Sequence, residues 1–173
     1  SEVQLKRANL PVPLGPGGAC HDYVPFYFGP RSPMLYRLWK GLVQGYTGGQ
    51  EPLVYLVSSV DAVAEAGLKF VFTDGHALAT FTQWYETLAD LDKVDWHATA
   101  AKTWYDTNED PDRCRRKQAE FLIHKRCPWA LVRGIAVVGE DQARQVRQIL
   151  SAYPEELRPP VAAKPEWYFY CPT

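Results

Sequence analysis

Apolar and polar residues alternate in short runs along this chain, and several runs have the length and composition of β-strands. Val, Leu, Ile, Phe and Tyr are concentrated in them, and glycine, proline or short polar residues bound most of them. The runs that predict strands are residues 23–28, 53–58, 70–72, 119–123, 131–138 and 166–170.

Other segments repeat their apolar residues with the spacing of a helix. Ser32 and Pro33 have the chemistry of a helix start, with serine as N-cap and proline at the first helical position. The helices predicted are residues 33–42, 61–66, 80–91, 96–104 and 141–152. Because strands and helices are mixed without regular βαβ alternation, the pattern predicts an α+β fold.

Length and composition fit a globular protein: the 173 residues are 46% hydrophobic and 23% charged, which excludes a disordered chain. Such a length predicts one domain with its own core. The cysteines, Cys20, Cys114, Cys127 and Cys171, lack the spacing of a zinc site, so we expect free thiols and no metal. No apolar run approaches the roughly 20 residues that span a bilayer, and residues 1–5 lack the pattern of a signal peptide. We therefore expect a cytoplasmic protein without membrane attachment.

Charge is distributed unevenly. The net charge of -1 does not favour a nucleic-acid partner, yet residues 1–50 carry +3, residues 51–112 carry -9, residues 113–133 carry +6 and residues 134–173 carry -1. Two basic segments on either side of an acidic one permit a cleft for an anionic ligand or a phosphodiester chain. A solvated run of charges explains the same pattern, so both interpretations stay open.

Glu120 is the most unusual residue for its position. It lies near the start of an otherwise apolar predicted strand, shortly after a basic run, and burying a carboxylate costs several kcal/mol unless it is paired. A salt bridge to a neighbouring arginine and a catalytic carboxylate are equally good explanations.

Residues 22–36 combine aromatic side chains, Arg31 and a helix N-terminus, which suits stacking on a base or nicotinamide and binding of a phosphate. A core strand and helix would use the same residues for packing. His76 follows a turn at a strand end. The Rossmann, P-loop and α/β-hydrolase motifs are absent, which disfavours those three classes.

Four segments together resemble the DarT family of DNA ADP-ribosyltransferases, the toxin half of a bacterial toxin–antitoxin pair. They are residues 22–36 (DYVPFYFGPRSPMLY), 48–53 (GGQEPL), 73–76 (TDGH) and 117–122 (KQAEFL). The likeness extends from near Leu5 to Tyr168. It implies an ADP-ribosyltransferase fold with a split central β-sheet flanked by helices. It also implies transfer of ADP-ribose from NAD+, without a metal, to a base of single-stranded DNA, typically thymine, with release of nicotinamide.

The resemblance also assigns roles to residues. Glu120 corresponds to the family's catalytic glutamate, Arg7 to an arginine that contacts NAD+, and His76 to a histidine near the target base. Tyr27 and Ser32 are further residues expected at NAD+, together with Arg7 and Glu120. Family members begin with a further segment whose His-x-Thr motif holds NAD+, so we expect residues 1–173 to be a single, N-terminally shortened domain.

Residues 104–119 correspond to the family's substrate-recognition loop. The residues expected to contact DNA are Arg31, Met34, Trp104, Arg113, Arg115 and Arg116. The implied partners are single-stranded DNA and a macrodomain antitoxin of the DarG type, and we expect a monomer. Two alternatives remain: a catalytically impaired single-strand binder, and a transferase that acts on protein or RNA.

Overall fold

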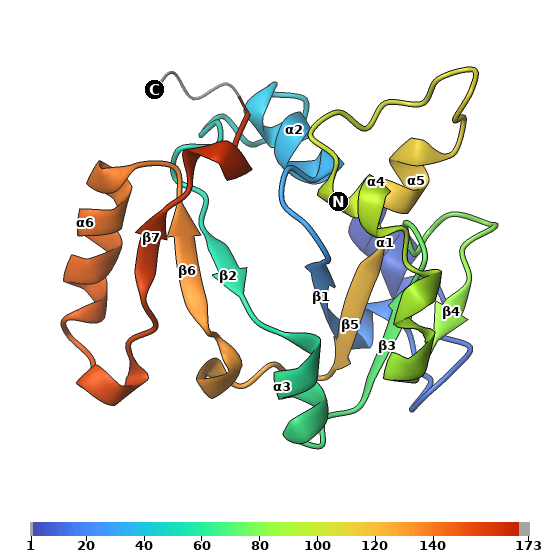
Figure 1. Cartoon of the computed structure of the whole chain (residues 1–173), viewed down its shortest axis with the longest axis horizontal. Helices are drawn as coiled ribbons and strands as arrows, with labels where there is room; N and C mark the ends of the chain where they lie inside the picture. Colours follow the sequence, from blue (N-terminus) through green and yellow to red (C-terminus); the bar gives the residue numbers. More distant parts are fainter. Residues whose placement is uncertain (1, 170–173) are drawn as a thin grey trace. The chain divides into compact units, whose positions relative to one another are not determined.

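The computed structural model describes residues 2–169. The chain forms two compact units: residues 1–32 with 63–127, and residues 33–62 with 128–173. Each unit has its own β-sheet and its own helices, so the predicted α+β class is confirmed (Figure 1).

The first unit is built on a four-stranded antiparallel sheet in the order β1-β5-β3-β4. Its strands are β1 (Tyr23–Tyr27), β3 (Phe70–Thr73), β4 (Trp84–Tyr85) and β5 (Glu120–His124). Strand β5 lies between β1 and β3, and its first four residues are buried, which means that both faces of the sheet are covered there. Pro25 is tolerated because β1 is an edge strand. In the β1–β5 register, Tyr27 lies opposite Glu120.

Short helices surround this sheet. They are α1 (Glu2–Asn9), α4 (Trp96–Ala100) and α5 (Arg113–Lys117), with 3-10 turns at Cys20–Asp22 and Leu88–Lys93. Helix α3 (Val60–Glu65) begins in the second unit and ends in the first. One buried cluster of the core comprises Val12, Cys20, Tyr23, Val71, Ala77 and Leu122.

The second unit contains a three-stranded sheet in the order β2-β6-β7, formed by β2 (Tyr55–Val57), β6 (Gly134–Val137) and β7 (Val161–Ala163). Strands β2 and β6 are antiparallel, whereas β6 and β7 are parallel. The helices are α2 (Pro33–Trp39) and α6 (Glu140–Leu150), and 3-10 turns lie at Trp129–Leu131, Glu155–Leu157 and Pro165–Trp167. Gln50, 1% exposed, accepts a hydrogen bond from Phe169 N (2.9 Å), which explains the amide in the 48–53 segment.

Two predicted elements are wrong. Residues 80–91 contain no α-helix but the strand β4 and a 3-10 turn, because their threonines and aromatic residues favour pairing with β3. Residues 165–167 form a 3-10 turn rather than a strand, and the strand of this region is β7, which precedes Pro165. Tyr170, the last residue of that prediction, lies outside the described residues.

Helices α1 and α5 are also absent from the predicted elements. Helix α5 is mostly basic, and α1 is a mainly polar sequence without a buried residue, so neither shows an apolar face. Cys20, Cys114 and Cys127 form no disulfide bond among the described residues, and Cys171 lies outside them. Within residues 2–169, no helix has the length and apolar composition needed to cross a membrane. The same residues contain no group of three or more His, Cys, Asp or Glu side chains placed to hold a metal ion.

Candidate active site

The centre of the candidate site is an ion pair between α1 and β5. Arg7 Nη1 donates to Glu120 Oε2 at 2.8 Å, and the Glu120 side chain is 3% exposed. The second carboxylate oxygen, Oε1, accepts a hydrogen bond from Ala77 N at 3.1 Å. Because a buried carboxylate is costly unless it is paired, these two donors are what allows Glu120 to remain charged at the start of β5.

Thr73 fixes the backbone beneath this carboxylate. Its hydroxyl donates to Gly75 O (2.7 Å) and accepts from Glu120 N (3.1 Å), so one side chain joins the end of β3, the following turn and the start of β5. The turn then carries Ala77 N to the Glu120 carboxylate. The pairing of strands thus places both the carboxylate and its backbone donor.

One nitrogen of the Arg7 guanidinium makes no hydrogen bond to the described residues. This nitrogen, Nη2, is buried. Burial works to lower the pKa of Arg7, but the charge of Glu120 outweighs it and raises the pKa, so the guanidinium is charged. A charged guanidinium with an unused donor can bind an anionic or carbonyl oxygen of a ligand.

Tyr27 and His76 complete the group. Burial raises the pKa of Tyr27, and the charge of Glu120 raises it further, so the phenol stays protonated. Burial lowers the pKa of His76, partly offset by Glu120. His76 Nδ1 accepts a hydrogen bond from Leu78 N (3.2 Å), which leaves the proton of the neutral ring on Nε2. His76 is therefore a hydrogen-bond donor at neutral pH rather than an acid.

Sequence reasoning missed Cys20. It is fully buried, and its charge state is coupled to those of Arg7 and Glu120. Burial raises the pKa of its thiol to about 11, so Cys20 is an uncharged packing residue and not a nucleophile. The backbone donor Ala77 N was missed as well, because a main-chain amide leaves no signal in side-chain identity.

The basic residues predicted to contact DNA differ in their surroundings. Arg115 donates to Asp112 (2.7 and 2.8 Å), Asp74 (2.8 Å) and Thr82 (3.3 Å). Arg116 pairs with Asp95 and Asp110 and lies 3.6 Å from Asp112.

Arg113, by contrast, forms no ion pair with any described residue. The carboxylate partners of Arg115 and Arg116 all come from the acidic segment 51–112, so part of the charge asymmetry is neutralised within the fold.

The remaining predicted residues are more dispersed. Ser32 is buried just before α2, and Arg31 has a left-handed backbone with φ of 56°. Trp104 is half-buried in the segment between α4 and α5. Met34, 54% exposed, lies on α2 in the second unit. The structure thus brings together Arg7, Tyr27, His76 and Glu120.

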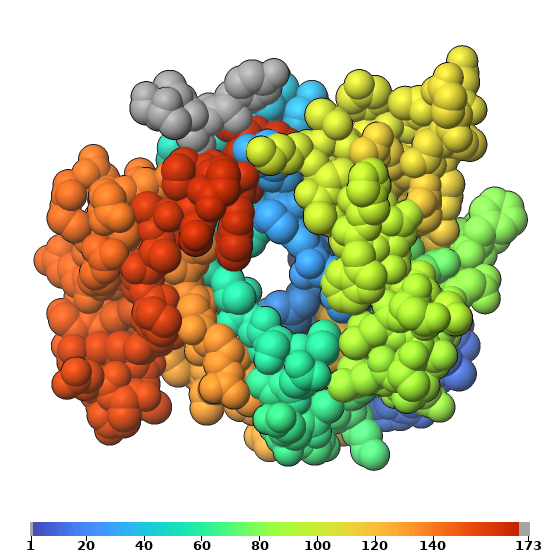
Figure 2. Space-filling view, viewed as in Figure 1, coloured from blue at the N-terminus to red at the C-terminus, as the bar shows by residue number. Residues whose placement is uncertain are grey.

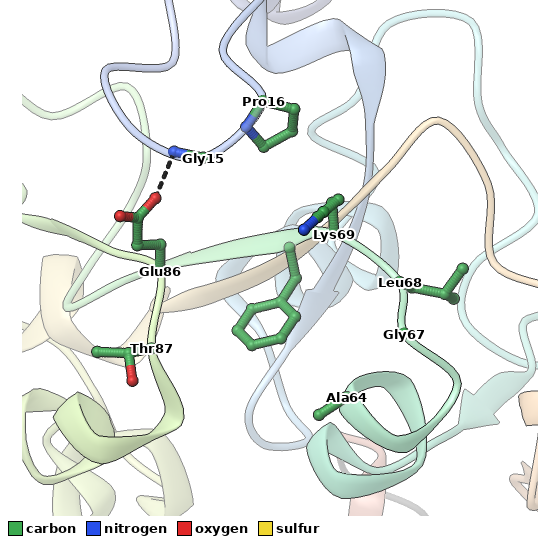
Figure 3. Close-up of a pocket in the computed structure, with 9 residues that line it drawn as sticks. Gly15, Pro16, Ala64, Gly67, Leu68, Lys69, Glu86 and Thr87 are labelled. Carbon is green, nitrogen blue, oxygen red and sulfur yellow. Dashed lines mark hydrogen bonds between the residues drawn. The ribbon is translucent and has the colours of Figure 1, made fainter.

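A cavity of about 700 Å³ lies elsewhere in the first unit, between the 15–16 turn, the end of α3 and the start of β3 (Figure 3). Lys69 and Glu86 are its charged residues, and Glu86 accepts a hydrogen bond from Gly15 N at 2.6 Å. Because Arg7, Tyr27, His76 and Glu120 do not line it, we place the chemistry at the Arg7–Glu120 pair rather than in this cavity.

The family model described as "ssDNA thymidine ADP-ribosyltransferase, DarT" matches residues 1–169. This match assigns the class of the site, that of an ADP-ribosyltransferase. The DNA ADP-ribosyl transferase of Thermus sp. (strain 2.9) is 46% identical over 169 residues, which are 98% of this chain and 79% of that protein. The DNA ADP-ribosyl transferase of Escherichia coli O127:H6 is 41% identical, over 97% of this chain and 76% of that protein. The chain belongs to the DarT family.

Solved structures agree with this assignment. Thermus sp. 2.9 DarT in complex with ADP-ribosylated ssDNA matches with a TM-score of 0.91 and 45% identity, over 97% of this chain and 78% of that one. The same Thermus protein in complex with NAD+ matches with a TM-score of 0.89 and 46% identity, over 95% and 81% of the two chains. The expected fold, including its split into two sheets, is confirmed.

Proposed function

We propose that this protein transfers ADP-ribose from NAD+ to thymine in single-stranded DNA and releases nicotinamide. The observation that carries the proposal is the buried Arg7–Glu120 pair, with one arginine donor unused, in a chain of the DarT family. The ligands named for the Thermus relatives, NAD+ and ADP-ribosylated ssDNA, support the same reaction.

The chemistry follows from the charges. When the bond between nicotinamide and C1′ of the ribose breaks, nicotinamide leaves with the bonding electrons and positive charge develops at C1′. A fixed carboxylate stabilises that charge, and Glu120 is fixed by Arg7 and Ala77 N before any substrate arrives. The base then forms the new bond to C1′ and gives up a proton, which Glu120 can accept.

The neighbours of Glu120 have complementary tasks. The unused Nη2 of Arg7 binds an oxygen of NAD+, where a guanidinium suits the pyrophosphate. The Nε2–H group of neutral His76 donates to a carbonyl oxygen of the target base, and Tyr27 offers a protonated phenol to either substrate. A base inside a duplex cannot reach such a buried carboxylate, which favours a single strand.

Mass measurement tests this function. The protein is incubated with NAD+ and a single-stranded oligonucleotide that contains thymine, and with a matched oligonucleotide in which every thymine is replaced. We expect a gain of one ADP-ribose on the first only. Glu120→Gln, which keeps the shape of the side chain but loses its charge and one of its two accepted hydrogen bonds, should reduce the rate by about 10²–10³-fold. Binding without a mass gain would support a single-strand binder instead, and label on protein or RNA would redirect the substrate assignment.

We further propose that the protein is the toxin of a toxin–antitoxin pair and that a macrodomain antitoxin of the DarG type reverses its effect. Induction in a bacterial host should arrest growth with the native sequence and not with Glu120→Gln. Normal growth with active enzyme would contradict the toxin role. Co-expression of the macrodomain should remove ADP-ribose from the modified DNA.

A further inference from the structure

Lys117 is the last residue of α5 and is 2% exposed, an unusual environment for a lysine. Its ammonium donates to three backbone carbonyls: Pro30 O at 2.8 Å, Thr99 O at 2.6 Å and Ala101 O at 2.9 Å. Lys117 forms no ion pair with any described residue. Its three donors are therefore all used, and all are used to hold the main chain.

The three carbonyls belong to two segments that approach each other closely. Pro30 lies in the turn between β1 and α2, and Thr99 and Ala101 lie at the end of α4. A β-carbon at Gly29 would collide with the carbonyl oxygen of Thr99, and Arg31 is held at positive φ. A tight and strained turn thus rests against the end of α4, and the Lys117 ammonium joins them.

The same point is the base of the segment 102–112, which lies at the surface between α4 and α5 (yellow in Figure 2). Lys117 fixes its start through Ala101. Its middle is held by Asp106, which accepts from Cys114 N at 2.7 Å, and its far end by the ion pair of Asp110 with Arg116. Both ends of the segment are therefore anchored to α5, which runs directly into Glu120.

We infer that Lys117 is a positioning residue for transfer to DNA: by joining the 29–31 turn to the end of α4, it sets the segment 102–112 beside the Glu120 site. The inference rests on the proposed function and on the role in substrate recognition that the family resemblance implies for residues 104–119. Lys117 itself touches no substrate.

The charge of Lys117 gives the inference a readout of its own. Burial, together with the charge of Arg31, lowers the pKa of Lys117 to about 8. The charged groups on the packed elements are Arg31 in the turn, Asp95 at the N-cap of α4, His97 on α4, Lys102 after it, and Arg113, Arg115 and Arg116 on α5. Asp95 is paired with Arg116, and Arg115 is paired with Asp74 and Asp112. Above pH 8 the neutral amine has two N–H groups for three carbonyls, so one contact is lost.

The experiment compares the native chain with Lys117→Arg, Lys117→Met and the control Lys125→Met, an exposed lysine at the other end of β5. Rates of oligonucleotide modification are measured from pH 6.5 to 9.5. Hydrogen exchange of residues 99–112 is followed in parallel and corrected for the intrinsic effect of pH. We expect the native rate and the protection of residues 99–112 to fall together around pH 8. Loss of one charged hydrogen bond predicts about a ten-fold effect on each.

Lys117→Arg keeps its charge over this range, so it should lack the alkaline decline, and Lys117→Met should show low protection at every pH. Lys125→Met should match the native chain. An alkaline decline that persists in Lys117→Arg, or unchanged exchange in Lys117→Met, would overturn the inference. If Lys117→Met does not fold, the pH dependence of exchange in the native chain decides. If the native chain modifies no DNA, the proposed function fails. Hydrogen exchange of residues 99–112 then still tests whether Lys117 holds the segment.

Discussion

Arg7 and Arg115 are both part-buried arginines with carboxylate partners in the same unit, yet they differ in what they have left to bind. Arg115 donates hydrogen bonds to Asp112, Asp74 and Thr82 through all three of its nitrogens. Arg7 makes one bond, to Glu120, and keeps a buried Nη2 without a partner among the described residues. The difference teaches that spare donors, rather than the density of positive charge in the sequence, distinguish a ligand-binding arginine from a structural one.

His76 connects the two regions. Its backbone N donates to Arg115 O at 3.0 Å, and the charge state of its ring is coupled to those of Glu120 and Arg7. The turn after β3 therefore transmits the position of α5 to the candidate active site. A residue larger than glycine at position 75 would place its β-carbon where the Arg115 side chain lies.

The largest effect is expected at Arg7. Arg7→Ala leaves a buried carboxylate unpaired, so the free energy of unfolding should fall by roughly 3–5 kcal/mol and transfer should be lost. Arg7→Lys restores the charge beside Glu120 but not the second guanidinium nitrogen. We expect stability in urea to recover while transfer from NAD+ stays low. Recovery of both would show that the spare donor has no role.

Arg115→Ala should act on stability. Removing its bonds leaves Asp74 without that partner and loosens α5, which predicts a loss of about 1–3 kcal/mol in the free energy of unfolding. The dependence of DNA affinity on salt should stay close to that of the native chain, because this guanidinium is already neutralised. A clearly flatter salt dependence at native stability would instead place DNA phosphates on Arg115.

His76 predicts a decline of activity in acid. Its pKa is lowered, so the ring is neutral at pH 7 and gains a proton only below its ordinary value of 6.5. Because the unfolded chain binds that proton more readily, stability too is lost as pH falls through this range. Protonation adds a hydrogen to Nδ1, which can then no longer accept from Leu78 N, so the ring loses the contact that orients its Nε2–H group. Transfer measured between pH 4.5 and 7 should therefore fall on the acid side, and less so in His76→Gln, whose starting rate is lower. His21→Gln, at an exposed histidine, is the control.

The smallest effect is expected at Arg113, which has no ion pair among the described residues. If it neutralises one phosphate, Arg113→Ala should flatten the plot of log affinity against log salt by about 0.7 for a single-stranded oligonucleotide. The control is Arg144→Ala, an exposed arginine on α6. Equal slopes in both variants would place the DNA away from Arg113.

Much of the fold could be predicted from the sequence because its signals are local. The buried runs of β3 and β5, the proline start of α2 and the spacing of α6 all depend on neighbouring residues. Strand β4 could not be predicted, since its two residues form a strand only through pairing with β3.

The candidate site was only partly visible for the same reason. Glu120 stood out because a carboxylate in an apolar strand is costly, but the partner that resolves the cost is 113 residues away on α1. Lys117 belongs to a basic run, and the local sequence does not show that this lysine is buried while Arg115 and Arg116 form ion pairs. Their partners come from remote segments that only the fold brings together.

Gly29 has a consequence for how this activity can be lost by mutation. Every amino acid other than glycine carries a β-carbon, and at this position that atom would meet the Thr99 carbonyl. Every missense change of this codon, whatever residue it introduces, therefore forces apart the segments that Lys117 joins. In a population selected for escape from the active protein, codon 29 should accumulate diverse replacements, whereas codon 113 should show few.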